Sequence, residues 1–90
     1  MREEKIQLAK GRTASSIEEA CLRAGLSISM KGSLKQLPVN THWHFKLGKD
    51  RGVLELTFLP DSDELIFSVH DNRKGEWQDD MITRLREVLG

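Results

Sequence analysis

The fold of this chain is decided by residues 41–69, which read THWHFKLGKDRGVLELTFLPDSDELIFSV. Apolar and polar residues alternate within three parts of this stretch, namely Thr41–Leu47, Val53–Leu59 and Glu64–Val69. Alternation at this period is typical of a half-buried strand. The intervening residues 48–52 and 60–63 are rich in Gly, Pro and Asp, which favour turns. The stretch therefore predicts an antiparallel meander of three strands.

The register of the meander follows from the side chains that must be buried. We expect Gly48 to face Val53 and Leu59 to face Glu64, because a slip by one residue would turn charged side chains into the core. The inward rows in this register are apolar throughout: Trp43–Phe58–Leu65, Phe45–Leu56–Phe67 and Leu47–Leu54–Val69. The outward rows are Lys46–Glu55–Ser68, His44–Thr57–Ile66 and His42–Leu59–Glu64.

Two helices are predicted, one before and one after the meander. Ser15 and Ser16 each stand three residues before a glutamate, which is the capping-box pattern of a helix start. We expect this first helix from about Ser16 to Ala24. Near the end of the chain, an apolar stripe at helical spacing predicts a second helix from about Glu76 to Leu89.

A further alternating segment, Leu26–Gly32, lies between the first helix and the meander. We expect it to form a fourth strand in which Ile28 and Met30 extend the buried rows. The connector Ser33–Asn40 contains a proline and is expected to be irregular.

These elements predict an α+β fold. The expected architecture is a two-layer sandwich in which an antiparallel meander of three to four strands carries two helices on one face, in the order α-β-β-β-β-α. A chain of 90 residues has the size of one domain, and we expect a single α+β domain over residues 13–90. Residues 1–12 are charged and weakly apolar, so we expect a flexible or weakly ordered N-terminal arm.

The composition argues against a partner that is held by long-range charge. Lys+Arg and Asp+Glu number 14 each, so a nucleic acid would have to be bound by a local patch. We expect no membrane partner, because no stretch has the length and apolar character of a membrane span or a secretory signal. A lone Cys21 excludes an internal disulfide and fits a reducing compartment, which predicts a cytoplasmic protein.

The histidines do not assemble a metal site in the predicted register. His42 and His44 point the same way, but His70 lies about 20 Å from His42 at the rise of a strand. Glu64 lies about 9.5 Å from His42 at normal strand spacing. Because a zinc site needs at least three protein ligands, the sequence predicts no metal and no cofactor.

No catalytic set comes together in the predicted fold either. Cys21 lies on the apolar side of the first helix without a nearby base, and Ser68 has no histidine in its row. The sequence therefore predicts no catalytic residues and a protein that is not an enzyme.

The uncovered face of the sheet is the predicted binding surface. It carries apolar side chains scattered among polar ones, a mixture that is common at modest interfaces. We expect a small non-catalytic interaction module that binds a protein partner or itself through this face. The residues predicted for partner binding are His44, Val53, Thr57, Leu59 and Ile66.

A basic pole is the alternative binding surface. The loops at 48–52 and 70–75 are expected at the same end of the sheet, where they would gather Lys49, Arg51, Arg73 and Lys74. Four cations beside a helix N-terminus could bind nucleic acid or phosphate. Asp50 and Asp71 are interleaved with these cations, so we place this alternative second.

Overall fold

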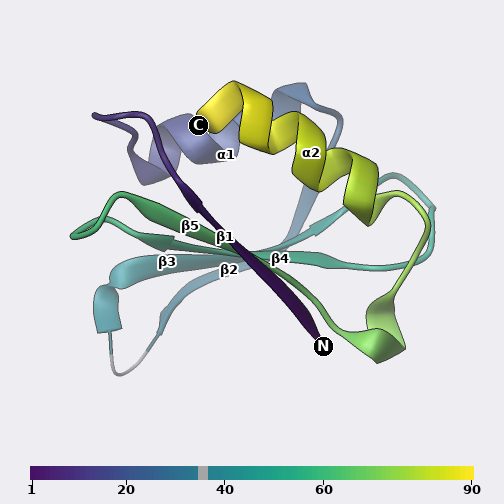
Figure 1. Ribbon diagram of the computed structural model, residues 1–90. Coiled ribbons are helices and arrows are strands. Elements are labelled where there is room, and N and C mark those ends of the chain that lie inside the picture. The colour runs from purple at the N-terminus through teal and green to yellow at the C-terminus, as the bar shows by residue number, and fades with distance from the viewer. Residues whose placement is uncertain (35–36) are drawn as a thin grey trace.

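A five-stranded antiparallel sheet carries two helices on one face (Figure 1). The computed structural model describes the backbone of residues 1–34 and 37–90, and the side chains of residues 1–33 and 40–90. The strands are ordered β1-β5-β4-β3-β2 across the sheet. The elements in chain order are β1 (Arg2–Gln7), α1 (Ala14–Arg23), β2 (Ser27–Leu34), β3 (Leu37–Lys46), β4 (Leu54–Leu59), β5 (Glu64–Val69), the 3-10 turn η1 (Asp71–Arg73) and α2 (Gln78–Leu89). The predicted α+β class with an antiparallel sheet is confirmed.

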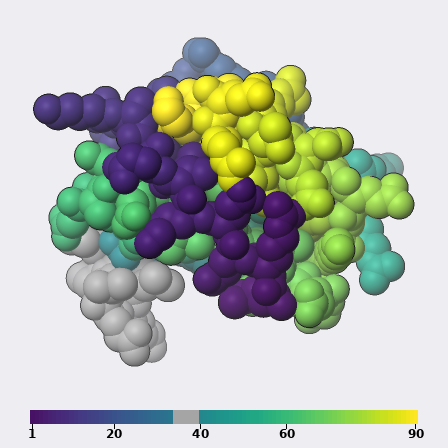
Figure 2. All heavy atoms as spheres, viewed as in Figure 1, coloured from purple at the N-terminus to yellow at the C-terminus, as the bar shows by residue number. Residues whose placement is uncertain are grey.

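The N-terminal residues form an edge strand where residues 1–12 were expected to be a loose arm. Strand β1 pairs with β5 along its whole length, Ile6 is buried, and Glu4 forms an ion pair with Arg86 of α2. Figure 2 shows this purple segment packed against the yellow end of the chain. The predicted count of three to four strands and the order α-β-β-β-β-α are therefore wrong, because the sheet has five strands and a strand precedes α1.

Both helices lie close to where the sequence predicts them. Thr13 is the residue that caps α1: its hydroxyl accepts the Ser16 N–H, and its own N–H donates to the Ser16 hydroxyl. The observed capping box therefore begins at Thr13. The first of the two predicted boxes begins two residues later, at Ser15. Helix α2 begins after Trp77. Neither helix of the described chain is long and apolar enough to cross a membrane.

The core lies between the helices and the covered face of the sheet. The strand side chains with no exposed surface are Trp43, Phe45, Leu54, Leu56, Leu65 and Phe67. The helices contribute Ile17, Cys21, Met81, Ile82, Leu85 and Leu89. The prediction that the alternating apolar residues of the meander face the helices is therefore confirmed for these strands.

One hairpin of the meander has the predicted register and the other does not. In β4–β5, Leu59 lies opposite Glu64 as expected. In β3–β4, Trp43 lies opposite Leu56, whereas the predicted partner was Phe58. A shift by two residues leaves every side chain on the same face of the sheet, so the burial pattern is unchanged while the cross-strand partners differ.

The cause of this shift lies in the connection between β3 and β4. Val53 was expected to pair with Gly48, but its N–H donates to the carbonyl of Arg73, 2.9 Å away. Gly48 and Gly52 have φ angles of +54° and +114°, which residues with a side chain rarely adopt. The loop is therefore wider than the tight turn that the sequence suggested.

The strand expected at Leu26–Gly32 is present as β2, with a different register. A bulge at Ser29 shifts its pairing with β3, and Met30 lies opposite His44 on the uncovered face. Met30 is 40% exposed and Ile28 is 37% exposed. The two side chains therefore do not extend the buried rows as expected.

The connector expected to be irregular at Ser33–Asn40 belongs mostly to strands. Ser33 and Leu34 end β2, and Leu37–Asn40 begin β3. Residues 35 and 36 of this expected connector lie outside the described residues.

Candidate functional site

The uncovered face of the sheet carries a polar cluster around Glu55. His42 and His44 are two residues apart on β3, Glu55 is on β4, and His70 follows β5. Alternate side chains of a strand project from the same face. Because Trp43 and its neighbours on β4 face the helices, these side chains face away from them. We call His42, His44, Glu55 and His70 the Glu55 cluster.

Three atoms of the Glu55 cluster form a nearly equilateral triangle. The Nε2 atoms of His42 and His44 lie 3.2 and 3.3 Å from Oε1 of Glu55. The two nitrogens are 3.2 Å apart. Within the described part of the chain, these three residues are the group whose ligand atoms lie close enough together to hold a metal ion.

The second carboxylate oxygen of Glu55 has its own cationic partners. Nε2 of His70 lies 2.9 Å from Oε2, and Nη1 of Arg73 lies 4.0 Å from it. The Glu55 side chain is only 10% exposed, although it stands on the uncovered face. A carboxylate at this depth is costly unless it is paired and hydrogen-bonded, and the surrounding side chains supply those partners.

The orientation of the two β3 histidines is set by further contacts. Nδ1 of His42 lies 2.7 Å from the hydroxyl oxygen of Thr57. The His42 and His44 rings pack edge to face, with centroids 5.1 Å apart and planes at 76°. The imidazole rings are therefore held in place by neighbours on both strands.

Burial also affects the charge of His44. Its partial removal from water lowers its pKa below the ordinary imidazole value, because desolvation disfavours the charged ring. The negative charge of Glu55 acts in the opposite direction, whereas the neighbouring cationic groups add to the lowering. At neutral pH His44 is therefore a neutral ring with a lone pair available.

The shift of β3 against β4 is what assembles this cluster. The predicted register paired Lys46 with Glu55, but the structure pairs His44 with Glu55. His42 and His70 both contact the Glu55 carboxylate, so the sequence argument that placed them about 20 Å apart is wrong. Sequence reasoning missed Glu55, His42 and His70 as site residues, and the only signal was the His-x-His spacing on a strand.

Four of the five residues predicted for partner binding project from the uncovered face, and Val53 directly precedes β4. All of them are half-buried: His44, Val53, Thr57, Leu59 and Ile66. Ile66 lies between Thr57 of β4 and Lys5 of β1. It therefore stands on the second strand from the β1 edge of the face.

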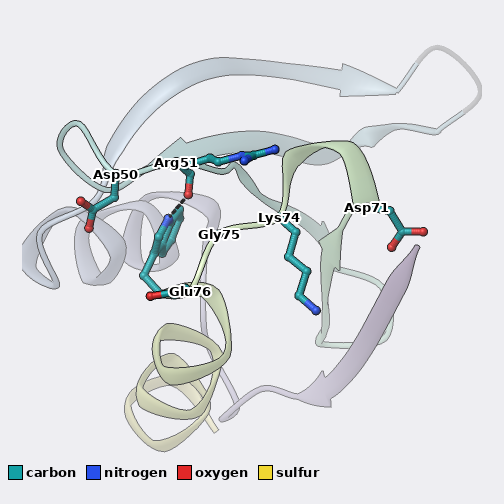
Figure 3. A pocket seen from close by; sticks show the side chains of 7 residues that line it. Asp50, Arg51, Asp71, Lys74, Gly75 and Glu76 are labelled. Atoms are coloured by element: carbon teal, nitrogen blue, oxygen red, sulfur yellow. Dashed lines mark hydrogen bonds between the residues drawn. The ribbon is translucent and has the colours of Figure 1, made fainter.

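The four residues predicted for the basic pole do not form one site, and Lys49 is an exposed loop residue that does not line the pocket described next. Arg51 and Lys74 line a pocket of about 790 Å³ beside the start of α2 (Figure 3). Arg73 approaches Glu55 instead. The charged residues that line the pocket are Asp50, Arg51, Asp71, Lys74 and Glu76. Three carboxylates against two cations do not favour an anion in this pocket.

Comparison of the chain with protein-family models, curated proteins and solved structures gave no match.

Proposed function

We propose that this protein is a small non-catalytic binding module of the cytoplasm, and that the uncovered face of its sheet binds a second copy of the chain. One observation carries the proposal. Both helices pack on the same face (Figure 1), so the half-buried Leu59 and Ile66 and the exposed Met30 stand on the other face without a covering layer.

The size of this face supports a weak association. Five strands spaced about 4.8 Å apart and six residues long cover about 24 by 20 Å, or about 480 Å² per copy. A stable interface of standard size buries about 800 Å² per partner. We therefore expect a dimer that forms at high protein concentration and dissociates on dilution.

The charges of the face suit a symmetric contact. Glu3 on β1 and Lys46 on β3 are exposed and lie toward opposite sides of the same face. A two-fold axis parallel to the strands and passing between β5 and β4 would place β3 of one copy over β1 of the other, which brings unlike charges together. A net charge of zero adds no long-range repulsion between the copies.

Two further observations favour a binding protein of a reducing compartment. Three pockets of the described chain are lined by residues other than His42, His44 and Glu55, whereas an enzyme has to enclose most of its substrate. Cys21 is a free, buried thiol, as is usual for a small apolar core residue in a reducing compartment.

The variant Ile66→Lys tests the proposal. A lysine at this half-buried position should abolish the concentration-dependent dimer, because each copy would bury an unpaired charge. Sedimentation equilibrium over a range of protein concentrations measures the association, and circular dichroism checks that the fold is kept.

The matched control is Leu22→Lys. Leu22 is a 46% exposed apolar residue of α1, so this variant adds the same charge on the helical layer. Its dimerisation should equal that of the wild type. A wild-type chain that stays monomeric at all concentrations, or a dimer that survives Ile66→Lys, would contradict the proposal.

A further inference from the structure

We propose that His42, His44 and Glu55 bind one divalent transition-metal ion, with Zn²⁺ as the natural occupant. The evidence is the triangle formed by two Nε2 atoms and Oε1, whose edges are 3.2, 3.2 and 3.3 Å. The metal would lie on the uncovered face, above the β3–β4 pair.

The size of the triangle matches the coordination sphere of zinc. In a tetrahedral site with bonds of about 2.0–2.1 Å, neighbouring ligand atoms are separated by about 1.6 bond lengths, or about 3.3–3.4 Å. The three edges of the observed triangle are within about 0.2 Å of that separation. An ion can therefore contact all three atoms after small adjustments of the side chains.

One tautomer of His42 leaves the triangle open to a cation. If Nδ1–H of His42 donates to the Thr57 hydroxyl, 2.7 Å away, its Nε2 carries a bare lone pair. That lone pair faces the lone pairs of Glu55 Oε1 across 3.2 Å. One N–H from His44 cannot bridge both atoms with good geometry. In this tautomer, a cation in the middle of the triangle can contact both Nε2 atoms and Oε1 at once.

The groups behind the three ligands are those that hold a metal site in shape. Thr57 orients the His42 ring through the nitrogen that does not face the triangle. His70 contacts Oε2 of Glu55 and leaves Oε1 for the ion. Such outer hydrogen bonds fix the tautomer and direction of metal ligands. The two strands that supply the ligands are interior strands of the sheet, so the positions of their backbones are well supported.

The donor set selects the class of ion. Two imidazole nitrogens and one carboxylate oxygen suit Zn²⁺ and its neighbours in the first transition series. Ca²⁺ and Mg²⁺ prefer sets made of oxygen atoms. Three protein ligands leave one position of a tetrahedron for water or another ligand.

The metal site and the self-association can fail separately. The ligands are three side chains of one copy, so binding of Zn²⁺ requires no second chain. The Ile66→Lys variant changes none of the ligands and should bind Zn²⁺ with the affinity of the wild type. A monomeric chain that binds Zn²⁺ would support the metal site and contradict the self-association. A dimer that binds no Zn²⁺ would do the reverse.

The test uses the full-length chain without a polyhistidine tag, after treatment with a chelator. Isothermal titration calorimetry with Zn²⁺ should show saturable binding of one ion per chain, and His44→Ala should lose this step. Co²⁺ bound in place of Zn²⁺ should give the strong visible absorption of a four-coordinate ion. The third histidine supplies the matched control: His70→Asn should keep one ion per chain, with affinity lower by about 10- to 100-fold.

A second measurement needs no variant and therefore does not depend on whether one folds. Long-range ¹H–¹⁵N spectra of the histidine rings in the wild-type chain should show Zn²⁺ moving the Nε2 signals of His42 and His44, while the His70 signals change little. The inference would be overturned by a wild-type chain without a saturable step, by unchanged binding in His44→Ala, or by ring shifts confined to His70.

Discussion

His44 and Glu55 lie directly opposite each other across β3 and β4, with Nε2 of the histidine 3.3 Å from Oε1 of the glutamate. Both side chains stand on the uncovered face and both are mostly removed from water. Desolvation lowers the pKa of His44, and the negative charge of Glu55 acts against this lowering. This pair therefore makes the uncovered face responsive to pH.

The first prediction concerns stability in mild acid. Desolvation is the main cause that lowers the pKa of His44, and in the unfolded chain the ring regains an ordinary pKa of about 6.5. Below this pH the unfolded chain binds more protons than the folded chain, so the unfolding free energy should decrease as pH falls through this window. Urea unfolding from pH 7 to 5 measures the effect. The decrease should be smaller in His44→Asn, and an equal decrease in both chains would contradict the assignment.

Glu55→Gln should lower the pKa of His44 further. The negative charge of Glu55 is the one cause that raises this pKa, and the amide removes it while keeping the shape of the side chain. A histidine titration followed by NMR gives the pKa in each chain. A His44 pKa that stays the same or rises in the variant would show that the pair does not interact as the structure indicates.

Glu18 should be important for stability because it connects α1 to the sheet. Its Oε1 lies 2.8 Å from Nζ of Lys31 and accepts the indole N–H of Trp43 at 3.1 Å, and these hydrogen bonds lower the pKa of Glu18. Glu18→Ala should reduce the unfolding free energy by about 1–3 kcal/mol, because the indole of fully buried Trp43 loses its acceptor. Urea unfolding followed by tryptophan fluorescence measures the loss. The control Glu19→Ala removes an exposed pair with Arg23 and should cost less than about 1 kcal/mol.

Gln78 should hold the loops at the end of the sheet against α2. This buried amide donates to the carbonyls of Val53 and Arg73 and accepts the N–H of Gly75. Gln78→Ala should reduce the unfolding free energy by about 2–3 kcal/mol and speed hydrogen exchange at the Gly75 amide. The exposed Gln7 also donates to two backbone carbonyls, so Gln7→Ala is the control and should cost below about 1 kcal/mol. Equal losses in the two variants would refute the special role of Gln78.

Nucleic-acid binding at the basic pole remains the alternative, and we expect it to be absent. The pocket beside α2 has more acidic than basic lining residues, which weakens the attraction for phosphate. Fluorescence anisotropy with short RNA and DNA at low and moderate salt measures any binding. Binding at low salt that weakens steeply as salt rises would instead support the basic pole, and Arg51→Ala and Lys74→Ala would then be expected to reduce it.

Much of the sheet could be predicted from alternation at period two. This pattern correctly placed Trp43, Leu56 and Phe67 in the core. It also gave the β4–β5 register, because the short turn at residues 60–63 leaves one pairing that keeps the charged residues out. The same pattern could not find β1, in which Ile6 is the only apolar residue and pairing depends on a strand far away in the sequence.

The Glu55 cluster could not be predicted for a related reason. The burial of side chains allows Trp43 to lie opposite either Phe58 or Leu56, because both possible partners are buried. The two registers differ on the uncovered face, where Glu55 meets Lys46 in one and His44 in the other. Burial therefore left the identity of the site undecided.

The amino-acid sequence by itself determined which side chains point toward the helices, since neighbouring residues of a strand face opposite sides of the sheet. Only the tertiary structure decided which residues meet across β3 and β4, and where β1 joins the sheet. Those outcomes depend on contacts between distant segments, such as the hydrogen bond from Val53 to Arg73 and the ion pair of Glu4 with Arg86. A local pattern carries no information about such contacts between distant segments.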